Sequence, residues 1–320
     1  MVPSLYRPFT RAWLYYSRDF NEMVYQIPRI FPLRDSEAEN RVIMVKQRPP
    51  EGSQIALMMD CIPELQTDGG SQCFPRWVYY EEETSSDDDQ LSFESQAAAT
   101  SGYRRRDAIT DEGLAHFEAV YTTEKITKDD LFYYVYGILH SVDYRTRYAD
   151  NLSKELPRIP AVKEVEDFWA FVGAGRKLGD LHCDYEGVEP FPVIFTRGDT
   201  GMFAPTDPVS FYRVEKMKFA GKRPKLDKTT VVYNGNITFT GIPLEAYDYV
   251  VNGKPALEWV MERQCVKTET DSGIVNDANC YAIESAGDPA YPLRLFQRVI
   301  TVSLKTMKIV RSLPSLGECQ

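Results

Sequence analysis

Residues 81–102 place the strongest limit on how this chain can fold. The stretch EEETSSDDDQLSFESQAAATSG has seven acidic residues and no basic residue between positions 81 and 94, and most of its other residues are small or polar. It has too few apolar side chains to offset the conformational entropy that ordering it would cost. We therefore predict an acidic disordered insert or linker over residues 81–112, between a segment 1–80 and a domain 113–320.

The segment before the insert is predicted to be mostly β. Three short β-branched or aromatic runs, at 42–46, 55–61 and 77–80, are separated by proline and glycine. Runs of this kind are typical of strands in a small sheet.

A pair of helices is predicted after the insert. Thr127 is followed by Asp129 and Asp130, which indicates a helix start, because threonine caps a helix and acids favour its first turn. Apolar residues recur every three or four positions beyond it, so we expect one helix over about 127–148 with a buried stripe. We expect core packing, and not base stacking, for the tyrosines of this region: Tyr133, Tyr134, Tyr136, Tyr144 and Tyr148.

The second helix of the pair is expected over about 162–182. Pro157 and Pro160 require an extended link before it. The small residues 173–175 lie inside its helical pattern, and we interpret them as a site of close helix packing.

Strands return between residues 193 and 242. The expected ranges are 193–196, 211–219, 229–233 and 237–240, and Asn234-Gly235 indicates a hairpin because both residues tolerate a positive φ. Helices over about 255–262 and 289–312 complete the chain. The predicted fold class is α+β: a small N-terminal β-rich part, a helix pair, an antiparallel β meander and terminal helices.

No enzyme motif is complete. Residues 173–177 lack the Gly-Lys-Ser/Thr ending of a P-loop. The chain also lacks the Asp/Glu-x-Lys triplet of metal-dependent nucleases, the Gly-x-Ser-x-Gly and His-Glu-x-x-His motifs, and the Asn/Asp-Pro-Pro-Tyr/Phe loop of amino-methyltransferases. We expect no catalytic residue and no cofactor in this chain.

Metal binding and membrane insertion are not expected either. The six cysteines form no Cys-x-x-Cys pair and only three histidines accompany them, so no metal site is predicted. His182-Cys183 is interpreted as a helix end with one buried thiol. No run reaches the roughly 18 apolar residues of a membrane helix, and the N-terminus is unlike a signal peptide. We expect a cytoplasmic protein with no membrane partner.

Four stretches resemble the type ISP single-chain restriction-modification enzymes. They are DLFYYVYGILHSVDYRTRYADNLSKELPRIP (130–160), YRPFTRAWLYYSRDFNEMVYQIPRIFP (6–32), GIPLEAYDYVVNGKPALEWVMERQCVKTETDSGIVND (241–277) and ITVSLKTMKIVRSLP (300–314). In the second, Thr10 stands where the family usually has Asp. The resemblance implies a C-terminal target-recognition part of a longer protein.

The resemblance also implies partners. The expected partners are duplex DNA and the adenine methyltransferase and translocase/nuclease modules of the same polypeptide, which would precede Met1. S-adenosylmethionine, ATP and magnesium are expected for that parent enzyme and not for this chain.

The candidate DNA contacts come from charge. The net charge is −10, yet residues 213–228 contain seven basic and two acidic residues. Phosphate contacts dominate DNA affinity, so this stretch is the first candidate, although a solvated edge strand protected by lysine would look similar. Its candidates are Arg213, Lys216, Lys218, Lys222, Arg223 and Lys225, with Asn234 and Asn236 as weaker candidates for reading adenine.

A second basic cluster contains Arg145, Arg147 and Lys154, with Arg158 expected to brace the proline link. The alternative function is a protein-protein scaffold, in which the acidic insert and the tyrosine-rich helices dock the translocase or methyltransferase and DNA contact is incidental. A contiguous positive surface about one duplex wide would favour DNA recognition.

Overall fold

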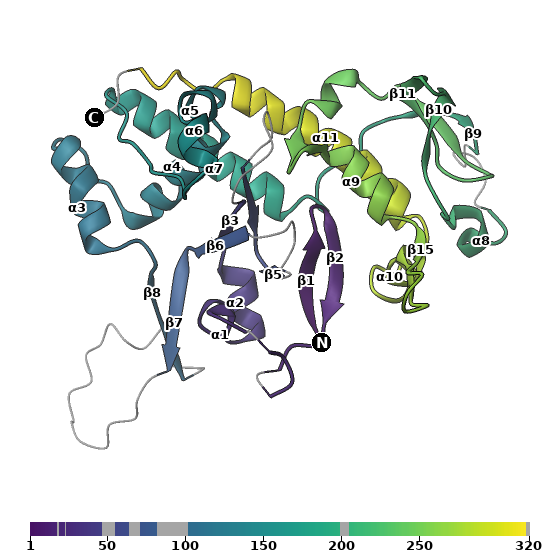
Figure 1. Ribbon diagram of the computed structural model, residues 1–320, viewed down its shortest axis with the longest axis horizontal. Helices are drawn as coiled ribbons and strands as arrows, with labels where there is room; N and C mark the ends of the chain where they lie inside the picture. Colours follow the sequence, from purple (N-terminus) through teal and green to yellow (C-terminus); the bar gives the residue numbers. More distant parts are fainter. Residues whose placement is uncertain are drawn as a thin grey trace.

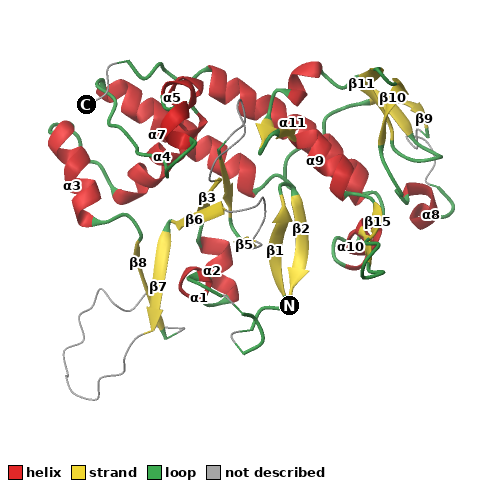
Figure 2. Ribbon diagram, in the orientation of Figure 1, coloured by secondary structure: helices red, strands yellow, loops and turns green. Residues whose placement is uncertain are grey.

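The computed structural model describes residues 1–17, 19–22, 24–46, 55–63, 71–81, 102–198 and 205–317. Helices and small, mostly antiparallel sheets alternate along the chain, which confirms the α+β class (Figures 1 and 2). None of the described helices has the length and apolar character needed to span a membrane. Residues 82–101 of the predicted insert 81–112 lie outside the described ranges. Its last part is ordered, because Tyr103–Asp107 form β8 and α3 begins at Asp111, and the domain boundaries drawn from the insert stay predictions.

The N-terminal part is β-rich, as predicted. The expected strands are found as β3 (Val42–Lys46), β4 (Ala56–Met59) and β7 (Trp77–Glu81). The elements that were not expected are β1 (Val2–Arg7), β2 (Thr10–Leu14), α1 (Ile27–Ile30), α2 (Arg34–Glu39), β5 (Ile62–Pro63), β6 (Ser71–Pro75) and β8 (Tyr103–Asp107). The sheets have the orders β2-β1-β5, β4-β3-β6 and β7-β8.

Strand β3 lies between two hydrophobic cores. Val42 and Met44 belong to the core formed with the C-terminal helices, whereas Ile43 and Val45 belong to the core formed with the central helices. Successive side chains of a strand point to opposite faces, so a strand buried on both faces is apolar throughout. The unbroken apolar run of β3 follows from this position.

The central helices are α3 (Asp111–Val120), α4 (Lys128–His140), α5 (Val142–Arg147), α6 (Ala149–Leu152) and α7 (Val165–Cys183). Thr127 is the N-cap of α4, as predicted, and forms a capping box with Asp130. Burial alone would raise the pKa of Asp130, but hydrogen bonds from Thr127 and Arg176 lower it below its usual value. The prediction of one helix to residue 148 is wrong, because Ser141 adopts an extended backbone and its side chain caps α5.

Helices α4 and α7 approach each other through glycines. A Cβ atom on Gly175 would lie 1.9 Å from the carbonyl oxygen of Tyr133, and one on Gly137 would lie 2.3 Å from that of Phe171. Nothing lies within 4 Å of the corresponding point at Gly173. The predicted close packing is therefore confirmed at Gly175 but wrong at Gly173.

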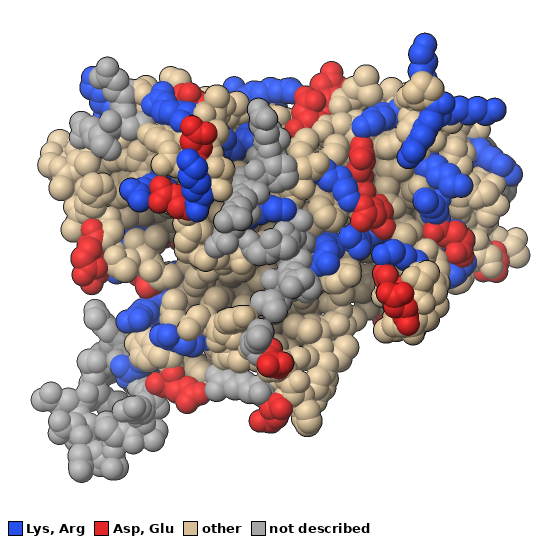
Figure 3. Space-filling view, in the orientation of Figure 1, with Lys and Arg blue, Asp and Glu red and all other residues tan. Residues whose placement is uncertain are grey.

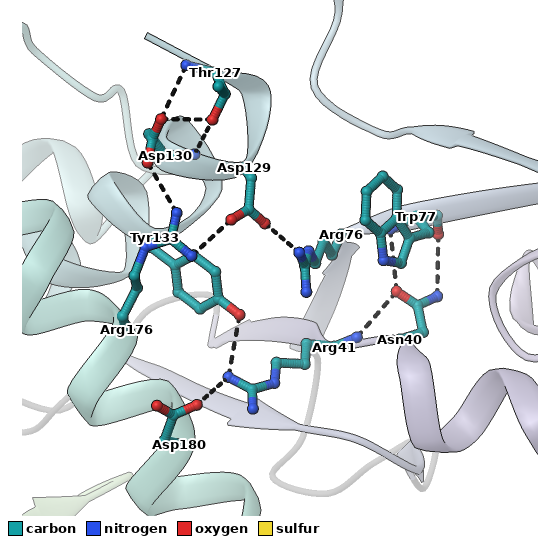
Figure 4. A network of polar contacts seen from close by, with 10 residues as sticks. All are labelled: Asn40, Arg41, Arg76, Trp77, Thr127, Asp129, Asp130, Tyr133, Arg176 and Asp180. Carbon is teal, nitrogen blue, oxygen red and sulfur yellow. Dashed lines mark hydrogen bonds and ion pairs between the residues drawn. The ribbon is translucent and has the colours of Figure 1, made fainter.

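A network of arginines and aspartates joins the N-terminal strands to this helix pair (Figure 4). Asp129 pairs with Arg76, which precedes β7, and with Arg176 of α7, both at 2.6 Å. Arg41, at the start of β3, donates to the Tyr133 hydroxyl at 3.1 Å. All three guanidinium groups lie within 6 Å of the Tyr133 ring centroid: Arg41 at 5.9 Å, Arg76 at 5.8 Å and Arg176 at 4.4 Å. Cation–π contacts and ion pairs thus fix the orientation of the two parts.

The C-terminal part contains the predicted meander. Strands β10 (Lys218–Lys222), β11 (Lys225–Val232) and β12 (Thr238–Thr240) are consecutive and antiparallel, and β9 (Ile194–Arg197) pairs with β12. The expected strand over 211–219 is wrong up to residue 217, because β10 begins at Lys218. Residues Pro208–Tyr212 form α8, because Asp207 caps it and Pro208 has the fixed φ of a first helical position.

Helices and short hairpins complete the fold. A 3-10 helix (Leu244–Tyr247) is followed by β13 (Val250–Val251), β14 (Lys254–Pro255), α9 (Ala256–Arg263), β15 (Val266–Thr268), β16 (Val275–Asp277), α10 (Ala278–Glu284) and α11 (Tyr291–Arg311). Helices α9 and α11 confirm the two predicted terminal helices. The long helix α11 buries Leu295, Phe296 and Val299 in the larger core.

Candidate nucleic-acid interface

The strongest group of exposed basic side chains lies on the β10–β11 hairpin. Lys216, Lys218, Lys222, Arg223 and Lys225 are all exposed, and none forms an ion pair with another residue that the structure describes. The sheet that contains the hairpin forms one end of the molecule (Figure 1). Lysine and arginine side chains gather over this end in the space-filling view (Figure 3).

Two lysines oppose each other at the hairpin's tip. Lys222 and Lys225 are direct cross-strand partners, joined through Arg223 and Pro224. Like charges directly opposite on a sheet destabilise it. This arrangement suits a surface whose counter-ion is supplied by a ligand, since one phosphate group placed between the two ammonium groups would remove the repulsion.

Two other basic residues of this stretch are neutralised within the fold. Arg213 pairs with Glu215 and with Asp277, both at 2.8 Å. Lys228 pairs with Glu258 at 2.8 Å and lies over the rings of Phe219 and Tyr247. Both side chains stabilise tertiary contacts, so the positive surface is narrower than the local charge of residues 213–228 indicates.

A shallow depression adjoins the base of the hairpin. It has a volume of about 480 Å³, and its lining includes Lys216, Lys218 and Asn236. Lysine ammonium groups and an amide side by side on an open surface can bind a phosphate and hydrogen-bond to a neighbouring polar edge.

Asn234 has a structural task. Its Nδ2 donates to the carbonyl oxygens of Phe211 and Arg213, both at 2.9 Å, and its Oδ1 accepts from the backbone amides of Asn236 and Ile237, both at 2.8 Å. These four bonds use both donors and both acceptor positions of the amide. The hairpin predicted at Asn234-Gly235 is present, but neither residue has a positive φ.

The second predicted basic group lies at the opposite end of the molecule, on α5 and the segment after it (Figure 1). Burial lowers the pKa of Arg145 to about 10. Arg147 donates to the carbonyl oxygen of Gly317 at 2.7 Å and pairs with Asp143 at 3.6 Å. Within this group, only Lys154 is exposed without an ion pair to a described residue. The structure therefore does not bring the two predicted groups together.

Tyrosine hydroxyls, and not Arg158, hold the proline link. The side chain of Arg158 is 85% exposed and pairs only with Glu155 among the described residues. Tyr144 donates to the carbonyl of Arg158 at 2.8 Å, and Tyr134 donates to that of Pro160 at 2.7 Å. The predicted bracing role of Arg158 is wrong. The predicted core packing is confirmed for Tyr133, Tyr134, Tyr136 and Tyr144, which are buried, whereas Tyr148 is only partly buried against the same core.

The adjacent His182 and Cys183 do not form a reactive couple. Both are buried at the end of α7, as predicted. His182 contacts the hydroxyl of Tyr136 at 2.6 Å and that of Thr306 at 2.9 Å. Burial raises the pKa of the Cys183 thiol, which keeps it in the weakly nucleophilic protonated form. In the described ranges, no group of three His, Cys, Asp or Glu side chains is arranged to hold a metal ion.

Sequence reasoning missed the basic ribbon formed by β7 and β8. Strand β8 carries Arg104, Arg105 and Arg106 in succession. The three successive arginines inside the predicted insert 81–112 were the available signal.

The family of this chain is defined by one match. Residues 1–295 match the model of the type ISP C-terminal specificity domain. A comparison with curated proteins found no match.

Three similar solved structures are DNA complexes. The ATP-dependent type ISP restriction-modification enzyme LlaBIII bound to DNA is 31% identical, with a TM-score of 0.78, over 99% of this chain and 18% of its own. A nuclease-deletion mutant of the type ISP enzyme LlaGI with a DNA substrate mimic is 34% identical, with a TM-score of 0.73, over 100% of this chain and 25% of its own. The protein of the DrdV–DNA complex is 32% identical, with a TM-score of 0.77, over 98% of this chain and 28% of its own. The chain spans less than a third of each of these proteins.

Proposed function

This chain belongs to the family of type ISP C-terminal specificity domains, and we propose that it recognises a duplex DNA sequence on behalf of a larger restriction-modification enzyme. Recognition here means fixing the register of the duplex through phosphate contacts and reading base edges in a groove. The similar enzymes LlaBIII, LlaGI and DrdV are described as DNA complexes, which supports this role.

The observation that carries the proposal is the basic surface of the β10–β11 hairpin. Five exposed basic side chains extend from the depression at Lys216 and Lys218 to the tip at Lys222, Arg223 and Lys225. The chain keeps this surface positive although its net charge is −10. A polyanion is the ligand that best complements such a surface.

The two types of basic side chain in the hairpin suit different tasks. Lysine is a point charge on a flexible stem, so Lys222 and Lys225 are assigned to phosphates. The guanidinium of Arg223 can bond the O6 and N7 atoms of guanine together, so Arg223 is the candidate for base reading. Asn236 replaces Asn234 as the amide next to the proposed contacts, because the Asn234 amide is used by the backbone.

The chemistry of the parent enzyme is assigned to other modules. We propose that an adenine methyltransferase and an ATP-dependent translocase/nuclease of the same polypeptide receive the DNA that this domain positions. S-adenosylmethionine, ATP and magnesium would bind to those modules. Such an enzyme acts on DNA in the cytoplasm, which is the location proposed for this chain.

A scaffold that docks the other modules is the second candidate. The expectation that the tyrosine-rich helices dock other modules is weakened, because the tyrosines of α4 are buried. Another observation favours it: Trp13, Tyr15, Phe20 and Tyr25 are exposed, and Phe20 reaches 77%. The rings of Tyr15 and Phe20 lie together, with centroids 6.3 Å apart, and contiguous exposed apolar side chains are typical of protein contact surfaces.

Binding of this chain to random duplexes across a salt series separates the two candidates. Each phosphate contact contributes about 0.9 to the slope of log affinity against log salt, so contacts by the four hairpin lysines give a slope of about −3.6. DNA recognition predicts a slope of this order. Binding that is absent, or insensitive to salt, would favour the scaffold.

A further inference from the structure

The β7–β8 ribbon presents two chemically different faces. Its register runs from Trp77 opposite Asp107 to Glu81 opposite Tyr103. Directly opposed residues share a face and neighbours along a strand alternate. One face therefore carries Tyr79 and Arg105, and the other carries the cross-strand pairs Val78–Arg106 and Tyr80–Arg104.

The first face, called here the inner face, anchors the ribbon to the body. Tyr79 is 8% exposed. Arg105 pairs with Glu39 of α2 and lies 4.7 Å from the ring centroid of Trp77. The buried amide of Asn40 bonds both the N–H and the carbonyl of Trp77, at 3.0 and 3.1 Å. The base of the ribbon is thus held in place before any ligand arrives.

The second face, called here the outer face, is basic and exposed. Arg104, Arg106 and Tyr80 are all exposed, and Tyr80 reaches 42%. The face contains no acidic residue between positions 78 and 80 or at 104 and 106. Glu81, the first of the seven acidic residues between positions 81 and 94, is on the inner face, where it accepts a hydrogen bond from Tyr103 at 3.4 Å.

The ribbon projects away from the central helices, at the opposite end of the molecule from β10 and β11 (Figure 1). Basic side chains lie beside this part of the surface in the space-filling view (Figure 3). A basic element so placed can contact DNA that the β10–β11 hairpin does not reach.

We propose that the outer face of the β7–β8 ribbon is a second duplex-DNA contact, in which Arg104 and Arg106 enter the major groove or bind its flanking phosphates. A two-stranded ribbon fits the major groove, which is about 12 Å wide. Guanidinium groups bond phosphates and guanine edges with two hydrogen bonds each. Because the inner face already fixes the ribbon, little conformational freedom is lost on binding. The inference rests on the proposed function.

Arg104 and Arg106 would touch the DNA directly, whereas exposed charges farther away than about 8 Å are screened at physiological salt. Duplex DNA is favoured over an acidic protein as the partner because the rest of the chain is assigned to DNA.

The test is the salt dependence of duplex binding by Arg104→Ala/Arg106→Ala. The slope of log affinity against log salt should become shallower by about 1.8, at 0.9 per contact. Arg105→Gln is the control for position on the strand: it removes one positive charge from the inner face, against two from the outer face in the double variant, and its slope should equal that of the wild type. Thermal unfolding of both variants confirms that they are folded.

A second measurement needs no substitution. Phenylglyoxal modifies accessible guanidinium groups, so bound duplex should reduce modification of Arg104 and Arg106 at least several-fold, while Arg158 reacts as before. The inference is overturned if the wild-type chain binds DNA with a steep slope but neither the double variant nor the protection pattern changes. Absence of salt-dependent binding by the wild type would instead overturn the proposed function.

Discussion

Gly175→Ala should open the contact between α4 and α7. The added Cβ atom would lie 1.9 Å from the carbonyl oxygen of Tyr133, against the 3.4 Å at which ordinary contact begins. Two helix backbones would have to separate by about 1.5 Å, because no flexible side chain can move aside. Forcing extra volume into a packed core costs roughly 1–3 kcal/mol and sometimes more, and we expect the upper part of that range.

Gly173→Ala is the matched control, two residues away on the same helix. Nothing lies within 4 Å of its added Cβ. Alanine is favoured over glycine in a helix interior by about 1 kcal/mol, so this variant should be slightly more stable than the wild type. Urea unfolding measures both free energies of unfolding. Equal stability of the two variants would refute the assignment of Gly175 as the contact point.

Three further predictions concern pH, the acidic segment and catalysis. Burial lowers the pKa of His140 in the folded chain to about 4, below the unfolded value of 6.5. The contribution of His140 to the free energy of unfolding is therefore fully present above pH 6.5, and about 3 kcal/mol of it is lost as the pH drops to 4. His140→Gln should lose visibly less stability over that interval, and an identical pH profile would contradict the buried neutral histidine. Replacing residues 82–101 with a short glycine linker should leave the thermal midpoint within about 4 °C of the wild type, and a larger drop would mean that the segment packs against the domain. The chain incubated with S-adenosylmethionine, ATP and magnesium should neither methylate nor cleave DNA, and turnover above the buffer control would overturn the assignment of chemistry to other modules.

Local signals predicted several of the longer elements, among them α4, α7, α9 and α11, and some of the failures have local causes too. The capping pattern at Thr127 was sufficient to place the start of α4. Serine is tolerated inside helices, so nothing in the sequence showed that Ser141 would end one and cap the next. The β1–β2 hairpin was missed because its turn places Phe9, and not glycine, at a φ of 57°.

Long-range partners explain what the sequence could not reveal about the site. The basic stretch 213–228 was visible as a charge cluster. The neutralisation of Arg213 by Asp277 and of Lys228 by Glu258 depends on residues 64 and 30 positions away. Likewise, three successive arginines in β8 do not reveal which of them face outward until the strand is paired with β7.

The central claim is that the tip of the β10–β11 hairpin binds DNA phosphates, and Lys222→Ala/Lys225→Ala tests it most directly. Its salt series should show a slope shallower by about 1.8 on every duplex, because two phosphate contacts are lost. Lys163→Ala/Lys177→Ala, which removes two exposed lysines near α7, is the control and should keep the wild-type slope. Arg223→Ala should cost roughly 1–3 kcal/mol on a duplex selected from a random pool and far less on random DNA. A wild-type slope and affinity in both the hairpin double variant and Arg223→Ala would contradict the claim and remove this hairpin from the interface.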